Sequence, residues 1–116
     1  MSKLLPGVFL AFMLLAGCQS GRPLYYWGHY ESMIYQSYAK PDKITAEQQI
    51  EQLQEDVQKA AAVNLPVHPG LHAHLGYLYY QLGKQDLAQK EFNLEKNLFP
   101  ESATFIDRVL NQSKPQ

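Results

Sequence analysis

Three histidines lie close together in the middle of the chain, at His68, His72 and His74. Imidazole is the commonest protein ligand of transition metals, so the cluster raises the question of a metal site. Positions two apart on a helix point to different faces, so His72 and His74 cannot hold one ion. Pro69 puts His68 outside the helix or at its cap, and no carboxylate or cysteine lies beside the three. A zinc site needs more ligands than this, so we expect ordinary helix histidines and no metal.

The acidic and hydroxyl side chains do not form a recognisable catalytic pattern. A hydrolase needs a nucleophile, a base and an orienting group in contact, and the sequence contains neither a G-x-S-x-G elbow nor a glycine-rich phosphate loop. The acidic residues Glu55 and Asp56, and also Glu91 and Glu95, are expected to be solvated helix faces. We therefore expect no enzyme activity and no cofactor.

Cys18 is the only cysteine, and its thiolate is the strongest nucleophile that the chain offers. Before it stand one cation, Lys3, an apolar run over residues 4–15 and a few small residues. This order is typical of a secretory signal, and the run is shorter than the ~20 residues that span a bilayer. The alternative is an ordinary signal that ends near Ala16 and leaves Cys18 as a free thiol.

The sequence Leu15-Ala16-Gly17-Cys18 resembles a bacterial lipobox. The resemblance implies a lipoprotein signal peptide at 1–17 and a lipidated tether at 18–23, with palmitate among the acyl chains on Cys18. Several acyl chains hold a protein firmly on a membrane, whereas one does not. Residue 19 is Gln and not Asp, which in a Gram-negative host implies the outer membrane, facing the periplasm.

Charge and cysteine content narrow the function further. The chain has ten Lys and Arg against eleven Asp and Glu, and removal of residues 1–17 would leave nine against eleven. No basic run exists, so we expect no nucleic-acid binding. A single cysteine allows no internal disulfide. The 99 residues that remain after position 17 suffice for a modest core.

Four aromatic residues gather just after the tether, at Tyr25, Tyr26, Trp27 and Tyr30. Tyr and Trp suit the headgroup layer of a membrane, and they also dominate the energetics of protein interfaces. In a small domain the same residues can simply complete the core. The sequence leaves these three interpretations open.

The rest of the chain predicts an all-α domain of about five helices over residues 24–112, followed by a frayed tail at 113–116. A first helix runs to Ala39 and ends before Pro41. Thr45 and Gln48 form a capping-box pattern. It opens a helix with one apolar stripe, made of Ala46, Ile50, Leu53, Val57, Ala60 and Ala61.

Residues 69–102 predict two helices joined by a turn at Gly83, with Pro69 opening the first. A last helix is expected after Ser102, which can cap it. The residues expected to face inward are Leu71, Leu75, Leu78, Tyr79 and Leu82, then Leu87, Ala88, Phe92 and Leu98, and finally Phe105, Ile106, Val109 and Leu110.

The same stretch resembles a tetratricopeptide repeat. Six anchors match, at Leu75, Gly76, Tyr79, Ala88, Phe92 and Pro100, whereas His72 replaces the usual Trp and Glu95 replaces a small residue. One repeat cannot bury its own apolar face, so the flanking helices must pack on it. Whether a degenerate repeat precedes residue 69 stays open. The resemblance implies peptide binding by the first helix, where His72, Tyr77 and Tyr80 are exposed or, alternatively, pack on the preceding helix.

The lipobox, the block from Tyr26 to Tyr30 and the single repeat together resemble a family of small bacterial lipoproteins of unknown function. That family is encoded beside homologues of CsgG, the curli-secretion channel lipoprotein. The resemblance implies an outer-membrane accessory protein that binds a CsgG-like envelope protein, and it implies no known activity. The alternative is a periplasmic lipoprotein that binds a ligand, peptidoglycan or a lipid surface through its aromatic residues. The sequence does not indicate the oligomeric state.

Overall fold

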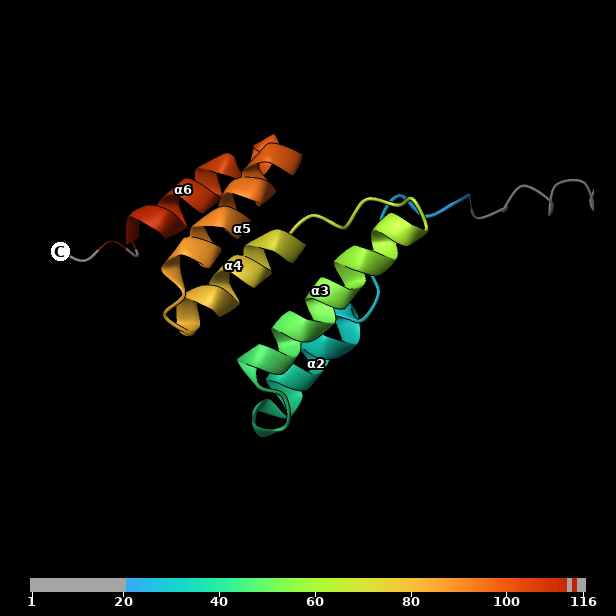
Figure 1. Cartoon of the computed structure of the whole chain (residues 1–116), viewed down its shortest axis with the longest axis horizontal. Helices are drawn as coiled ribbons and strands as arrows, with labels where there is room; N and C mark the ends of the chain where they lie inside the picture. The colour runs from blue at the N-terminus through green and yellow to red at the C-terminus, as the bar shows by residue number, and fades with distance from the viewer. Residues whose placement is uncertain (1–20, 113, 115–116) are drawn as a thin grey trace, which may run out of the picture.

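The computed structural model describes residues 21–112 and residue 114. Predictions that concern residues 1–20, including the signal peptide and Cys18, lie outside the described residues. The described chain is all-α with five helices and has no strand, as the sequence predicts (Figure 1). The helices are α2 (Tyr30–Ala39), α3 (Ala46–Ala62), α4 (Leu71–Gln81), α5 (Gln85–Leu98) and α6 (Ala103–Gln112).

Local signals set most of the helix boundaries. The capping box at the start of α3 is confirmed: the Gln48 backbone N–H donates to the Thr45 hydroxyl (3.2 Å), and the Thr45 N–H donates to the Gln48 side chain (2.9 Å). Gly83 has φ +72° and ends α4, as expected. The expected role of Pro69 as the first residue of α4 is wrong. The helix begins at Leu71, and the residue before it is Gly70, with φ +97°.

Two short 3₁₀ turns connect helices, η1 (Pro41–Lys43) between α2 and α3 and η2 (Pro100–Ser102) between α5 and α6. The Ser102 hydroxyl donates to the Phe99 carbonyl within η2 (2.7 Å). The expected side-chain cap of α6 is therefore replaced by a turn.

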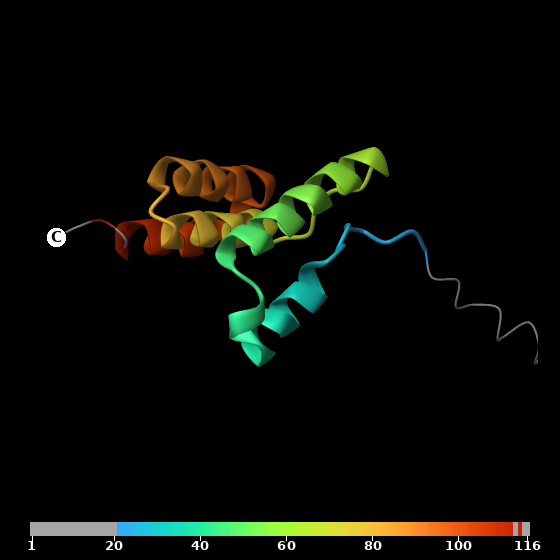
Figure 2. The same ribbon diagram turned by 60° about the horizontal axis from the view of Figure 1, so that its bottom comes forward.

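Helices α4 and α5 form a hairpin; α3 packs on α4, and α6 packs on α5 (Figures 1 and 2). The two helices of the hairpin approach closely at Gly76, because a Cβ there would lie 2.7 Å from the Phe92 ring. In Figure 2, helix α2 lies below α3, on the side away from α5. Its Met33 is fully buried in the core. Among the described helices, none is both long and apolar enough to cross a bilayer.

The core agrees with the expected stripes at most positions, and four predicted core residues are wrong. Leu87, Leu98 and Phe105 are 41%, 49% and 62% exposed. On α5 the face toward α4 consists of Ala88, Phe92 and Glu95, at spacings of four and three. Leu87 and Leu98 lie beside that face and not on it. Ala61, at the end of α3, is exposed as well.

Candidate functional site

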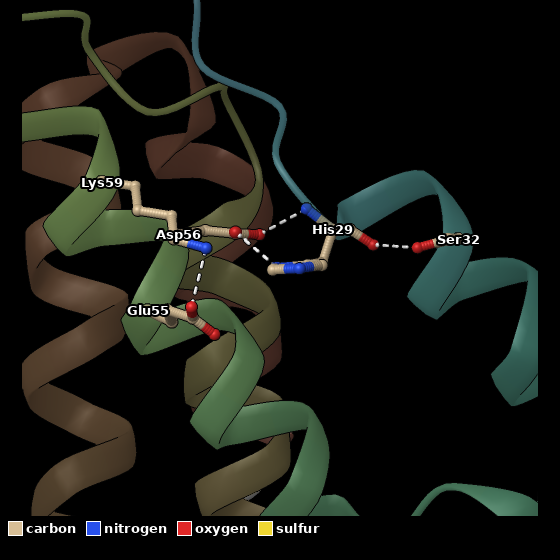
Figure 3. A network of polar contacts seen from close by, with 5 residues as sticks. All are labelled: His29, Ser32, Glu55, Asp56 and Lys59. Atoms are coloured by element: carbon tan, nitrogen blue, oxygen red, sulfur yellow. Dashed lines mark hydrogen bonds and ion pairs between the residues drawn. The ribbon is translucent and has the colours of Figure 1, made fainter. Parts of the chain in front are cut away.

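A buried carboxylate fixes the chain just before α2. Asp56 of α3 is fully buried, which corrects the expected solvated face. It accepts two hydrogen bonds from His29, one from the backbone N–H and one from ring Nδ1, both at 2.8 Å (Figure 3). Gly28 has φ +49°, and a Cβ at this position would overlap the Asp56 carboxylate. A glycine is therefore required where the chain crosses Asp56.

The neighbouring groups extend this contact. The Ser32 hydroxyl donates to the His29 carbonyl (2.9 Å) at the start of α2. Glu55, next to Asp56 in sequence, is exposed and pairs with Lys59 at 2.7 Å (Figure 3). Exposed pairs of this kind contribute little to stability, whereas a buried carboxylate must be paired. Asp56 and not Glu55 therefore holds the segment before α2 on α3.

Of the aromatic residues that follow residue 23, Tyr26, Trp27 and Tyr30 pack on the linker between α3 and α4. Trp27 stacks on His68 with ring centroids 4.3 Å apart and planes 4° apart, and Tyr30 lies 4.2 Å from the same imidazole. Tyr25 contacts Phe99 at 6.1 Å, edge to face, and Tyr26 makes an isolated parallel bridge with Val67. Of the three interpretations of these residues, packing has the most support, although Trp27 is 46% exposed.

The three central histidines are separated from one another by their partners. His68 is fully buried, and Nδ1 donates to the Pro69 carbonyl (2.9 Å), so the neutral ring carries its proton there. His68 Nε2 has no partner in the described part of the chain. His74 Nε2 lies 3.3 Å from the Gln49 side-chain oxygen. Burial lowers the pKa of both rings; for His68 the hydrogen bond to Pro69 opposes this effect.

His72 points the other way, toward α5. Its Nδ1 lies 2.7 Å from the Glu91 carboxylate, and the residue is only 6% exposed. Neither alternative for His72 is found, because the ring is not exposed and packs on α5 and not on the preceding helix. The expected solvation of Glu91 is wrong, because its side chain is 17% exposed. In the described residues no group of three or more His, Cys, Asp or Glu has an arrangement that could hold a metal ion.

Glu95 provides the cap of α4. The residue before α4 is Gly70, which has no side chain to accept from the free N–H groups of the first turn. Glu95 of α5 accepts from the Gly70 N–H (2.7 Å) and the Ala73 N–H (3.3 Å), and it is 2% exposed. Its expected solvation is wrong. A carboxylate at the N-terminus of α4 also interacts favourably with the positive end of the helix dipole.

These contacts position a groove between α2 and the layer of α4 and α6. The groove has a volume of about 710 Å³. A smaller hollow of about 200 Å³ adjoins it and shares Tyr77, Phe92 and Val109. The residues that line the groove are Tyr30, Ile34, Ser37, Tyr38, Pro41, Ile44, Gln49, Gly70, Ala73, His74, Tyr77, Leu78, Gln81, Phe92, Phe105 and Val109.

The groove brings together part of the predicted binding set. Tyr30 and Tyr77 line it, and Tyr80 lines the adjoining hollow. Tyr77 and Tyr80 are 53% and 42% exposed, which agrees with the first of the two alternatives for them. Tyr25, Tyr26, Trp27 and His72 do not line it. Sequence reasoning missed Tyr38 and Phe105, which are 84% and 62% exposed. Both are aromatic residues at helix positions that no other described helix covers, and an apolar residue of this kind was the available sequence signal.

The lining of the groove combines apolar surface with neutral polar groups. Its polar groups are phenols, amides, a hydroxyl and the imidazole of His74, and no Asp, Glu, Lys or Arg is among the described residues that line it. The aromatic rings provide apolar contact, and the amides and phenols provide neutral hydrogen bonds.

Comparison with known proteins gives one match. No curated protein and no solved structure matches the chain. A family described as a domain of unknown function, DUF4810, matches residues 24–109. The match begins at Leu24, before the aromatic residues that hold the linker, and includes α2 to α5 and most of α6. It covers well over half of the sequence, and the chain therefore belongs to the DUF4810 family.

Proposed function

We propose that this protein is a lipid-anchored accessory protein of the outer membrane that binds another envelope protein in the groove between α2, α4 and α6. The carrying observation is the open groove itself, with the exposed rings of Tyr38, Tyr77 and Phe105 on three different helices. A monomer rarely exposes several aromatic residues on one concave surface without a binding role. The family resemblance supports a CsgG-like assembly or export protein as the partner.

The helical arrangement supports a tetratricopeptide-like module. The hairpin of α4 and α5 has its close contact at Gly76 and its turn at Gly83. The groove is lined mainly by alternate helices of the chain, α2, α4 and α6. Stacked helical pairs create concave binding surfaces in this way.

The chain just after the tether supports anchoring close to the membrane. The Arg22 guanidinium donates to the carbonyls of Val63 (2.8 Å) and Asn64 (3.0 Å) at the end of α3. Four residues span at most about 14 Å, so a lipid on Cys18 would keep this end of the domain near the bilayer. The C-terminus of α6 lies at the opposite end of the molecule (Figure 1), and the lateral groove would face the periplasm.

Binding of a ligand, peptidoglycan or a lipid surface by the aromatic residues has less support. The rings of Tyr25, Trp27 and Tyr30 contact side chains of the same chain. Trp27 is the most exposed of these residues, at 46%, and its outer face can contact headgroups without excluding a protein partner in the groove.

Affinity purification from cross-linked cells tests the proposal. A tagged chain should recover one envelope protein, and the Tyr38→Ala/Tyr77→Ala variant should lose most of it while remaining folded. Tyr35→Ala is the matched control, because Tyr35 is 68% exposed on α2 and does not line the groove. Equal recovery by all three proteins would contradict a role for the groove. Recovery of a partner other than a CsgG-like protein would contradict only its proposed identity.

The anchor is tested separately. Cys18→Ser should leave unprocessed precursor and no acylated species in a mass spectrum. Normal processing and membrane fractionation of Cys18→Ser would exclude the lipid anchor while leaving the groove proposal intact.

A further inference from the structure

The neutrality of the groove restricts its ligand. Its lining contains no Asp, Glu, Lys or Arg among the described residues, although such residues make up 18% of the sequence. A charged side chain that enters a partly apolar groove loses water without gaining a counterion, which is unfavourable. The segment that occupies the groove should therefore be uncharged where it is covered.

The pattern of rings and polar groups restricts the conformation of that segment. Tyr38, Tyr77 and Phe105 present exposed ring faces from three helices. The Gln81 amide donates to the Tyr77 hydroxyl (3.0 Å), so the phenolic proton of Tyr77 is available to an acceptor in the groove. Gln49 adds a further amide beside His74. The groove thus contains both aromatic surfaces and neutral hydrogen-bond donors.

A polyproline II segment fits this pattern better than a helix does. A helix satisfies its own backbone carbonyls, so it would bring few acceptors for the amides and phenols of the groove. A polyproline II backbone makes no internal hydrogen bonds and offers its carbonyls outward. Proline-rich segments bind aromatic-lined grooves, and they lose little entropy because they are already extended.

We propose that the groove binds an uncharged, proline-rich segment of the partner protein in the polyproline II conformation. This inference rests on the proposed function and names the ligand class of the same site. The rings of Tyr38, Tyr77 and Phe105 pack on successive prolines, and the Tyr77 hydroxyl donates to a backbone carbonyl of the segment.

Fluorescence anisotropy with the purified full-length chain tests the ligand class. The probe is a labelled decaproline peptide that is otherwise blocked at both ends, and it should bind saturably. Two comparison peptides, one with two central prolines replaced by Glu and one with both replaced by Lys, should each bind about tenfold more weakly. A blocked, neutral, Ala- and Leu-rich helical peptide should also bind more weakly than decaproline.

Single variants locate the binding. Tyr38→Ala and Tyr77→Ala should each weaken decaproline binding about tenfold, as for an aromatic anchor at an interface. Tyr35→Ala, on the same helix as Tyr38 but outside the groove, should change the affinity by less than about twofold. Circular dichroism should show the same helical content in all three variants.

The outcomes separate this inference from the proposed function. Absent decaproline binding, binding insensitive to Tyr38 and Tyr77, or tighter binding of a charged or helical peptide would each overturn the polyproline proposal. If the cellular partner is still recovered in a Tyr38- and Tyr77-dependent manner, the groove keeps its proposed function and only the ligand class is wrong. If that recovery is also absent, both proposals are wrong.

Discussion

At the scale of single residues, burial of two carboxylates explains why particular backbone groups lie where they do. Asp56 and Glu95 are 0% and 2% exposed, and each accepts two hydrogen bonds from residues that lie between 22 and 27 positions earlier in the sequence. A buried carboxylate without such donors would be strongly destabilising. The residues that supply the donors, His29 and Gly70, are therefore as constrained as the acids themselves.

Replacement of Gly28 by Ala should destabilise the fold. The new Cβ would overlap the Asp56 carboxylate, and φ +49° is unfavourable for any residue with a Cβ. We expect a loss of about 2 kcal/mol or more in the free energy of unfolding, measured with urea. Gly83→Ala is the control, because φ is +72° and the added Cβ meets no atom within 4 Å. A loss in Gly28→Ala no larger than in Gly83→Ala would contradict close packing on Asp56.

Mild acid should destabilise the protein through His68 and His74. Burial lowers the pKa of both rings below 6.5 in the folded state, whereas the unfolded chain regains the ordinary value. Between the folded and unfolded pKa values the unfolded state binds more protons, so the free energy of unfolding falls as pH falls. The stability that these two neutral rings contribute is fully present above pH 6.5 and is lost as the pH falls toward their folded-state pKa values.

Urea unfolding at about pH 7.5 and 5.5, on either side of the ordinary histidine value, measures this effect. The His68→Phe variant retains a ring between Trp27 and Tyr30 and should show a smaller fall in stability over that interval. An unfolding free energy that stays constant or rises on acidification would show that the two buried rings are not held neutral by the fold.

At the scale of helices, two different kinds of contact hold α4 and α5 together. One is the close contact of Gly76 with the Phe92 ring, and the other is the carboxylate of Glu95 at the start of α4. The first sets the distance between the helices and the second sets their relative position along the axis. Both act on the wall of the groove that Ala73 and Tyr77 form.

Glu95→Ala should weaken this pair by about 2 kcal/mol, because it removes the acceptor of two backbone N–H groups in a buried site. Glu95→Gln, which keeps one acceptor oxygen, should lose less. Gln89→Ala on the exposed face of α5 is the control and should change stability by less than about 0.5 kcal/mol. Unfolding of Glu95→Ala at the same urea concentration as the parent would contradict the capping role.

Gly76→Ala tests the close contact. Alanine improves helix propensity by about 1 kcal/mol over glycine, but the Cβ would lie 2.7 Å from the ring of Phe92, which is 4% exposed and cannot move freely. Overpacking of this kind costs about 1–3 kcal/mol, so the net change should be destabilising. Adding Phe92→Leu should cost less in the Gly76→Ala background than in the parent. A Gly76→Ala protein that is more stable than the parent would contradict close packing of Gly76 against the Phe92 ring.

Local sequence signals predicted the elements well and the buried charges poorly. The capping box at Thr45 and the left-handed Gly83 depend on neighbouring residues, so they are visible in the sequence. The burial of Asp56 depends on His29, 27 residues earlier, and that of Glu95 on Gly70, 25 residues earlier. The groove was partly predicted, through Tyr30 and Tyr77. Tyr38 and Phe105 were missed because an apolar stripe does not reveal whether another element covers it.

At the scale of the whole molecule, the aromatic residues that follow residue 23 connect the α3–α4 linker to the groove. The rings of Trp27 and Tyr30 hold the α3–α4 linker through His68, and Tyr30 also forms part of the groove. The residues nearest the proposed anchor therefore position α2, which is one wall of the proposed binding site.

A photo-crosslinking amino acid at position 38, compared with the same amino acid at position 35, tests the groove most directly. Both positions are exposed on α2, and only residue 38 lines the groove. In intact cells, the proposal predicts a discrete cross-linked envelope protein at position 38 and none at position 35. Cross-links of equal yield at both positions, or at neither, would contradict a binding role for this groove.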